Sequence, residues 1–342
     1  MSKGNYNAWH IDLNRYTSLT SDKDRLRFLV GLGILAPSSH NSQPWEFTLE
    51  GTAIDIHAQV ERALPISDEN NRQLFISLGC ALENILTAAS AFGLTPTLNY
   101  HAQGAGITFP SLSATQTLAS DHLIHAIPAR STNRNPYLGP VSEDFLSTIK
   151  NLWTPDVDIR CPQVFAVSEP EKKKILADAV LGGLGDAMDD PKFRAELSNY
   201  VIHNLSSKKT GMPAFGLGIP TPPSFFVPTV LKYVNVHKLS RRQEEKLLKE
   251  QTPVFGIIAT QDDNPEVWMK AGQMYQRIAL MAHQAGLKTA VMAAAIQIGD
   301  YHKVLQNTLD TQLRPQVFFR LGKCDTLTPH SPRLSAEEVL KK

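Results

Sequence analysis

The stretch that decides the fold is "GCALENILTAASAFGL", residues 79 to 94. Apolar residues recur through it and just before it at helical spacing, and Gly93 stands where a helix C-terminal cap belongs. The residues on this apolar face are Phe75, Leu78, Leu82, Ile85, Leu86, Ala89 and Phe92. The pattern predicts a long helix with one buried face.

A similar stretch, "GQMYQRIALMAHQAGL", follows at residues 272 to 287. Aligned without gaps, the two stretches share a glycine at both ends, at an offset of 193 residues (272 minus 79, and 286 minus 93). Amphipathic helices that end in Gly-Leu are common, so chance similarity is one interpretation. The other is an internal duplication, in which two α+β halves, residues 1–125 and 126–342, pack these helices against each other.

Composition limits the class of protein. The 342 residues are 42% hydrophobic and 20% charged, which is typical of a globular chain with a substantial core. The formal net charge of +1 excludes a strong whole-molecule attraction to nucleic acid or to an anionic membrane. The N-terminus has no apolar core of the secretory type, and Cys80, Cys161 and Cys324 form no CxxC pair. We therefore expect a cytoplasmic protein.

The segments before and after the first long helix predict further helices and strands. Residues 22 to 36 predict a short helix, and "WEFTL" and "AIDIHA" predict a hairpin around Gly51. In the second half, "RRQEEKLLKEQ" predicts a charged helix, and "VFGIIAT" and "QVFFRLG" predict strands. Residues 206–228, "SSKKTGMPAFGLGIPTPPSFFVP", are too rich in Gly and Pro for a regular helix or a central strand. A linker or a lid would fit, and we favour a lid inserted in the second half.

Two short polar segments could bind a ligand. In "APSSHNSQPWEF", residues 36 to 47, two prolines restrict a loop that presents short donors and acceptors, and Trp45 is expected to anchor the first strand. His40 in this loop could face a ligand or solvent. In "ARSTNRNPY", residues 129 to 137, Arg130 and Arg134 bracket hydroxyl and amide side chains. Paired guanidinium groups suit a phosphate ester, although a solvated turn would look the same.

Two further patterns give weaker evidence for a binding site. "LGGLGDA", residues 181 to 187, follows a helix pattern and no strand, which argues against a dinucleotide-binding fingerprint. His122 and His125 are spaced to share a helix face, but no third ligand is evident, so no metal site is predicted.

The loop, the Gly-capped helix and "RSTNRNPY", in this order, resemble the nitroreductase-like FMN-binding flavoproteins and, within them, the duplicated, Acg-like branch. Ordinary members are homodimers in which one subunit supplies an "RRSxR" motif and its partner a "PSxxNxQPW" loop. Here the first half has the loop and the second half has the arginine motif. The resemblance implies a three-layer α+β fold, two fused halves packed as an internal pseudo-dimer around long central helices, and one complete FMN site.

The resemblance also implies which residues hold FMN. Arg130, Thr132 and Arg134 match the family's phosphate and ribityl ligands, and Ser131 stands where a second arginine is usual. Arg333 is the candidate for a basic residue that returns to the phosphate, and Ala293 lies in a stretch whose backbone faces the ring. The cofactor-binding candidates are Pro37, Ser38, Ser39, Asn41, Gln43, Arg130, Ser131, Thr132, Arg134, Ala293 and Arg333.

The implied function is an oxidoreductase in which FMN takes a hydride from NAD(P)H and passes electrons to a small nitro- or quinone-type acceptor. No side chain is then obliged to act as nucleophile or general base, so no catalytic residue is assigned. The alternative is a protein that stores FMN without turnover, with Phe215, Phe225 or Phe226 of the lid packed on the ring. A protein-interaction scaffold would leave the two arginines without purpose. A monomeric pseudo-dimer and a homodimer are both compatible with this reading.

Overall fold

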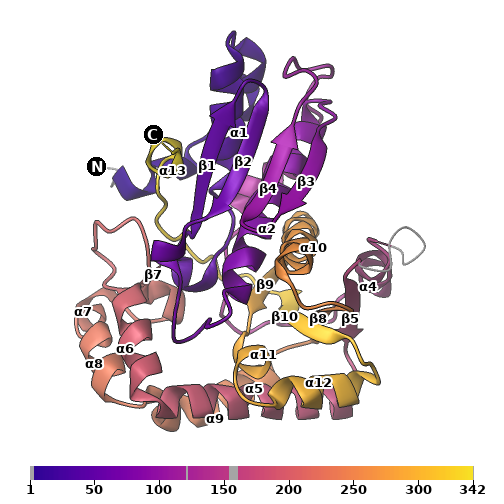
Figure 1. Cartoon of the computed structure of the whole chain (residues 1–342). Coiled ribbons are helices and arrows are strands. Elements are labelled where there is room, and N and C mark those ends of the chain that lie inside the picture. Colours follow the sequence, from indigo (N-terminus) through magenta and orange to yellow (C-terminus); the bar gives the residue numbers. More distant parts are fainter. Residues whose placement is uncertain (1–3, 121, 154–160, 342) are drawn as a thin grey trace.

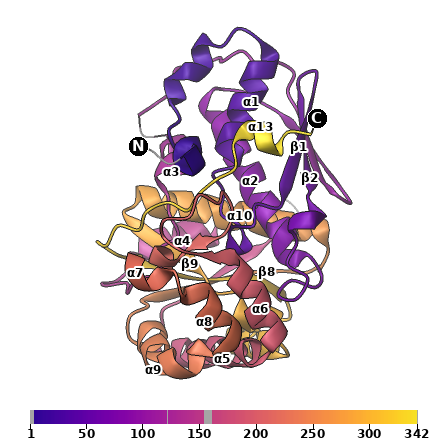
Figure 2. The same cartoon turned by 90° about the vertical axis from the view of Figure 1, so that its left-hand side faces the viewer.

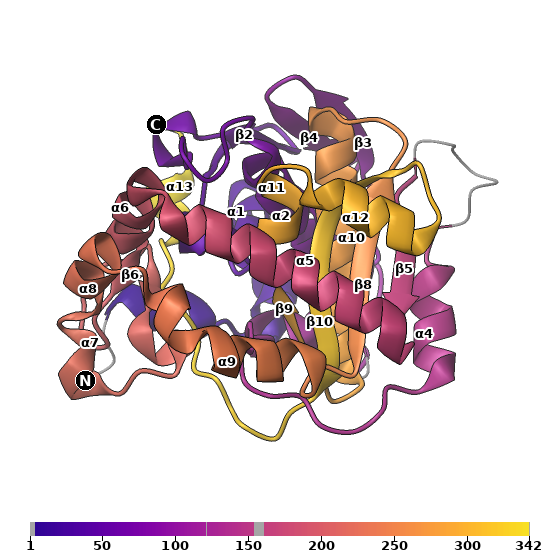
Figure 3. The ribbon, with the colours of Figure 1, turned by 90° about the horizontal axis from the view of Figure 1, so that it is seen from below.

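The computed structural model describes residues 4–120, 122–153 and 161–341. Within them the fold is α+β: a helix pair lies between two antiparallel sheets, and further helices cover the outer side of the second sheet (Figures 1 and 3). The longer helices are α1 (Asp22–Gly33), α2 (Arg72–Ala91), α4 (Glu143–Lys150), α5 (Pro170–Asp189), α6 (Pro191–Tyr200), α9 (Val236–Lys249), α10 (Pro265–Gln284) and α12 (Tyr301–Leu309). Shorter ones are α3 (Ala126–Ala129), α7 (Thr221–Ser224), α8 (Val227–Tyr233), α11 (Ala294–Gln297) and α13 (Ala336–Val339).

The first sheet contains the predicted hairpin. Its strands are β1 (Trp45–Glu50), β2 (Ala53–Ala58), β3 (Thr97–His101) and β4 (Gly104–Thr108), in the order β1-β2-β4-β3. Apolar side chains such as Phe47, Ile54 and Ile56 are fully buried, while the residues between them are more exposed, so one face of the sheet packs on the core. Trp45 is buried as predicted.

The second sheet repeats this arrangement with different residues. Its strands are β5 (Gln163–Val167), β8 (Val254–Thr260), β9 (Leu287–Val291) and β10 (Arg314–Lys323), in the order β5-β8-β10-β9. Every residue of β8 is buried because helices cover both faces of the sheet. In each sheet the strands lie in the spatial order first, second, fourth, third along the chain.

The central helices α2 and α10 cross at the two glycines of the sequence match. A Cβ atom on Gly79 would lie 2.0 Å from the Met269 carbonyl oxygen, and one on Gly272 would lie 2.0 Å from the Ile76 carbonyl oxygen. The four residues form two pairs at the offset of 193 (272 minus 79, and 269 minus 76), so the contact is reciprocal. Contacts of this kind are typical of two-fold interfaces.

Helix α2 is long and apolar enough to cross a membrane by length and composition alone, but 89% of that stretch is buried inside the protein. A core helix has the same properties. Helix α1 ends at Gly33, three residues before the predicted end, because the chain closes in tight turns ahead of Pro37.

A long insertion separates β5 from β8 and carries α5 to α9 and the two-residue strands β6 (Val201–Ile202) and β7 (Met212–Pro213). Residues 206–228 lie inside it and contain β7, a 3-10 turn, α7 and the start of α8, so short helices do form there, contrary to the expectation from the sequence. Proline begins or caps these pieces, which keeps them short. The "LGGLGDA" motif lies in the last turns of α5 and not after a strand, so it is no dinucleotide-binding turn.

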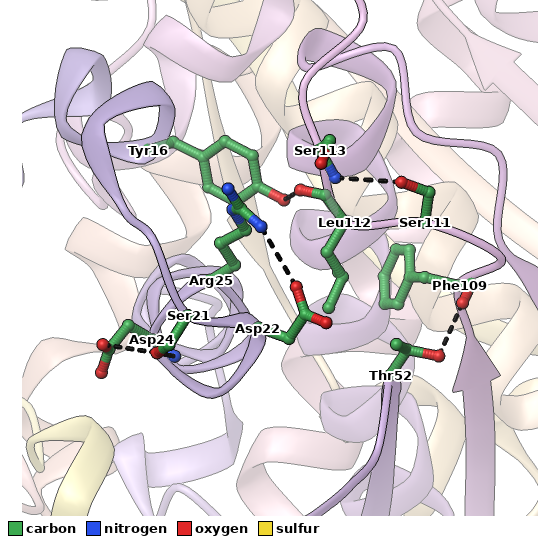
Figure 4. A network of polar contacts seen from close by, with 10 residues as sticks. All are labelled: Tyr16, Ser21, Asp22, Asp24, Arg25, Thr52, Phe109, Ser111, Leu112 and Ser113. Atoms are coloured by element: carbon green, nitrogen blue, oxygen red, sulfur yellow. Dashed lines mark hydrogen bonds and ion pairs between the residues drawn. The ribbon is translucent and has the colours of Figure 1, made fainter.

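Both ends of the chain pack on the first half. At the C-terminus α13 lies beside α1 and β1, and the Lys341 N–H donates to the Phe47 carbonyl oxygen at 2.8 Å (Figure 2). Near the N-terminus, Tyr16 Oη donates to the Leu112 carbonyl oxygen at 2.8 Å, and Thr52 Oγ1 to that of Phe109 at 2.7 Å (Figure 4). These contacts tie the irregular segment after β4 to the N-terminal segment and to the turn between β1 and β2.

Candidate functional site

A cavity of about 310 Å³ lies between the proline-bounded loop, α2, the β9–α11 connection and the insertion. The loop contributes Pro37, Ser38, Ser39 and His40, and Ala293 lies in the wall at the start of α11. Apolar residues of the insertion complete the wall: Val180, Leu184, Ala187, Phe193, Leu197, Met212 and Leu217. A mostly apolar cavity with a few polar groups on one side suits a flat, largely apolar ring system.

A small cleft of about 40 Å³ adjoins the cavity and contains the arginine motif. Its lining includes Arg130, Ser131, Thr132, Arg134 and Arg333. Thr132 and Arg134 line both spaces, so the two are continuous. The structure thus brings together an apolar cavity and a basic cleft from segments about 90 and 200 residues apart along the chain.

Arg130 carries the strongest electrostatic signal. Its side chain is 3% exposed, and its Nε and Nη1 have no hydrogen-bond partner among the described residues. Burial lowers the pKa of Arg130, and the described chain offers it no ion pair with a carboxylate. A buried guanidinium without a partner is unfavourable, and an anion in the cleft would relieve that cost.

Arg333 is also buried but is largely satisfied. Its Nη1 donates to Asn41 Oδ1 at 2.5 Å, its Nη2 donates to the Ala36 carbonyl oxygen at 3.0 Å, and its Nε has no partner in the described chain. The guanidinium also lies 4.8 Å above the Trp9 ring. Burial and the neighbouring Arg130 lower the pKa of Arg333 to about 9. Arg333 therefore joins the loop to the cleft and adds positive charge beside Arg130.

The chain is similar to known proteins over most of its length. No family model matches the chain. It is 25% identical over 343 residues to an uncharacterised protein of Mycobacterium tuberculosis, covering 92% of each chain. It is 24% identical over 339 residues to another protein of that species, named "Putative NAD(P)H nitroreductase acg", covering 92% of this chain and 95% of the other.

A solved structure extends the likeness to the fold. The crystal structure of "a putative nitroreductase" from Anabaena variabilis superposes with a TM-score of 0.53 at 12% identity, covering 92% of this chain and 91% of the other. The chain has a nitroreductase-like fold. The relatives in M. tuberculosis support its resemblance to the Acg-like branch.

In this nitroreductase-like fold, two of the predicted loop residues have a different position from the others. Asn41 and Gln43 are buried but do not line the cavity. Asn41 Nδ2 donates to the Gly211 carbonyl oxygen at 2.9 Å, and Gln43 Nε2 donates to that of Lys209 at 2.7 Å. Both amides therefore hold the insertion against the loop, while Pro37, Ser38 and Ser39 face the cavity.

His40 belongs to the cavity wall, an alternative that the sequence left open. Its backbone has φ of +50°, and its Nδ1 is buried without a partner in the described residues. Burial lowers the pKa of His40 to about 4, so the ring is neutral near pH 7. A neutral imidazole with an unused nitrogen can exchange a hydrogen bond with a bound molecule.

Sequence reasoning missed the contribution of α2. Gln73, Ser77 and Cys80 line the cavity, together with Gln297 after the β9–α11 connection. The three α2 residues are separated by four and three positions, so they share one face of a helix whose other residues are mostly apolar. This polar stripe was the available signal. The phenylalanines proposed to cover the ring do not line the cavity, since Phe225 is 49% and Phe226 70% exposed and Phe215 lies outside the wall.

Proposed function

We propose that the chain binds one FMN, with the phosphate in the basic cleft and the ring in the adjoining cavity. The observation that carries the proposal is Arg130, a buried guanidinium with unused donors in the cleft that adjoins a mostly apolar cavity. Arg134 and the hydroxyls of Ser131 and Thr132 line the same cleft and would add donors to the same phosphate oxygens. Arg333 would supply a second buried charge next to Arg130.

The activity that fits is an NAD(P)H-dependent reduction of a small nitro- or quinone-type compound. FMN held by these residues would supply the redox chemistry between the nicotinamide and the second substrate. The protein's own residues orient the bound molecules and enclose them. Ser38, Ser39 and Gln73 present polar groups at one side of the cavity, and Leu184 and Phe193 exclude water at another. The three free cysteines support a reducing, cytoplasmic location.

We also propose that the chain is a fused pseudo-dimer with one intact FMN site. The reciprocal crossing of α2 and α10 and the shared strand order support an origin by duplication. At the offset of 193, Gln273 corresponds to Cys80 of the cavity wall (80 plus 193). The Tyr100 hydroxyl donates to Gln273 Oε1, and the Lys270 ammonium lies 5.5 Å from the centre of the Tyr100 ring. In the second half, the residue at the position of Cys80 is thus bound by Tyr100 of the first half, which supports one intact site per chain.

Storage of FMN without turnover is the second candidate, and the attachment of the lid favours it. Asn5, Asn41 and Gln43 all donate to carbonyl groups of residues 206–211, and Lys209 pairs with Glu338 at 2.8 Å. A lid held this firmly would slow exchange of substrates. Against it, the lid side chains in the wall are Met212 and Leu217, and neither is an aromatic ring that would stack on a flavin.

The first experiment compares flavin content in two matched double variants. Arg130→Ala with Arg134→Ala should lose FMN, since charge-assisted hydrogen bonds contribute about 1.5–3 kcal/mol each. Arg241→Ala with Arg242→Ala removes the same charge from an exposed face of α9 and should keep it. Full flavin retention in the first variant would refute the site.

Absorbance of the flavin-loaded protein under anaerobic NADPH, and then NADH, separates the two functions. Rapid bleaching supports the reductase. A protein that bleaches with dithionite but not with either nucleotide would support storage.

A further inference from the structure

A second group of chemically active side chains lies on the outer face of the first sheet. Asp55 and His57 belong to β2, and His101 ends β3. Strand β4 lies between β2 and β3, and in the register His57 and His101 are both opposite Gly104, while Asp55 is opposite Gly106 (Figure 1). Residues that are directly opposite in neighbouring strands point to the same face of a sheet. The two glycines therefore leave a gap across which the three side chains meet.

The donor atoms lie close together. Asp55 Oδ1 is 2.9 Å from His101 Nε2, and Asp55 Oδ2 is 3.6 Å from His57 Nε2. One potential ligand atom from each of the three residues lies within 4.8 Å of the other two. Donor atoms around a tetrahedral Zn²⁺ are about 3.3 Å apart, given metal–ligand distances of about 2.0–2.1 Å. Small side-chain rotations would therefore bring the three atoms into coordinating positions.

The surroundings are those of an open site. The three side chains are half-buried, which leaves the outer side accessible. An added Cβ on Gly106 would meet nothing within 4 Å, so the space next to this glycine on the outer face of the sheet is open. Glu46 of β1 lies opposite His57 and hence on the same face, where it adds a further carboxylate.

We propose that Asp55, His57 and His101 bind one divalent transition-metal ion, with Zn²⁺ as the best match. Two imidazoles and one carboxylate are a ligand set that borderline metals prefer over Mg²⁺ or Ca²⁺, which favour oxygen alone. Three protein ligands leave a coordination position open to water or to Glu46. The site lies on the outer face of a sheet and shares no residue with the cavity or the cleft.

Isothermal titration of the full-length protein with ZnCl₂ tests the proposal. We expect one ion per chain in the wild type. His101→Ala should weaken binding by more than the roughly 10- to 100-fold that loss of a residue orienting a ligand costs. His10→Ala, at an exposed histidine outside the cluster, should leave it unchanged. Equal binding in wild type and His101→Ala, or no binding in the wild type, would overturn the site and leave an ion pair between strands.

A second variant keeps all three ligands and closes the gap. Gly106 has an ordinary extended backbone with room for a side chain, whereas a Cβ on Gly104 would lie 1.8 Å from the Ile56 carbonyl oxygen. Gly106→Val should fold and bind Zn²⁺ more weakly, because the valine stands beside Asp55. Zn²⁺ should raise the melting temperature of the wild type but not of His101→Ala. An unchanged affinity in Gly106→Val would contradict the role given to the glycines. None of these readouts involves flavin, so the result is independent of the proposed function.

Discussion

At the scale of single residues, the candidate site depends on charge that the protein alone does not balance. Arg130 and Arg333 are both buried, yet only Arg333 uses most of its donors within the protein. His330 lies in the same cleft, and burial together with both arginines lowers its pKa to about 4. Unbalanced positive charge of this kind lowers the free energy of unfolding of the unliganded protein. It also strongly favours the binding of an anion.

This imbalance predicts opposite effects of one substitution on two forms of the protein. Arg130→Met keeps the approximate side-chain volume and removes the unpaired charge. It should raise the free energy of unfolding of the flavin-free protein by about 1–3 kcal/mol and abolish the stabilisation that added FMN gives. Thermal unfolding with and without FMN measures both effects.

Arg320→Met is the matched control. Arg320 is equally buried but lies 4.4 Å from the Tyr137 ring and donates to the Asn135 carbonyl oxygen at 3.3 Å. This substitution should lower the stability of the flavin-free protein. A loss of stability in both variants would show that Arg130 has a partner in the unliganded protein.

At the scale of elements, glycine determines how closely the two central helices approach. Gly272 contacts the backbone of α2, so any side chain there would force the helices apart. The resulting distance places the polar pairs Gln276–Asn84 and Arg277–Glu83, each at 2.6 Å, in the same interface.

Alanine at two helical glycines should have opposite effects on stability. Gly272→Ala should lower the free energy of unfolding by about 1–3 kcal/mol or more, because a backbone carbonyl blocks the new methyl group. Gly31→Ala in α1 meets only the Ile11 side chain at 3.7 Å and should raise it by about 0.5–1 kcal/mol. Urea unfolding distinguishes the two. A neutral Gly272→Ala would mean that the helices can separate at little cost.

At the scale of the whole molecule, the interface between α2 and α10 makes stability depend on pH. Glu83 is 1% exposed, and burial raises its pKa from the ordinary value of 4.5 to about 7, although Arg277 acts in the opposite direction. Between these two pH values the native state holds a proton that the unfolded chain has lost. The free energy of unfolding should therefore fall as pH rises through this window, by up to about 1.4 kcal/mol per pH unit from this group.

The contribution of Glu83 to the pH dependence of stability is measured as a difference between two pH profiles. His40 and His330, whose pKa values are lowered to about 4, make stability rise with pH over part of the same range. Subtracting the pH profile of Glu83→Gln from that of the wild type removes their contribution. The difference should slope between pH 4.5 and 7. A flat difference for Glu83→Gln would mean that the carboxyl stays ionised in the native state.

Patterns local to the chain determined the elements and the order of the motifs. The hairpin after the polar loop, the two long helices with their glycines and the strands at residues 254–260 and 314–323 follow from spacing and turn chemistry alone. The resemblance carried by the loop and the arginine motif predicted that Arg130, Arg134, Ser38 and Ser39 contact one ligand. In the structure Ser38 and Ser39 line the cavity, Arg130 lines the adjoining cleft and Arg134 lines both.

Only the tertiary structure decided what each polar residue faces. Asn41 and Gln43 hold the insertion, Gln73 and Ser77 face the cavity, and Tyr100 donates to Gln273. The proposed zinc ligands lie close together because Gly104 and Gly106 of β4 stand between their strands. Burial and hydrogen-bond partners depend on segments far apart in the chain, and no local pattern records which of those segments arrive at a given side chain.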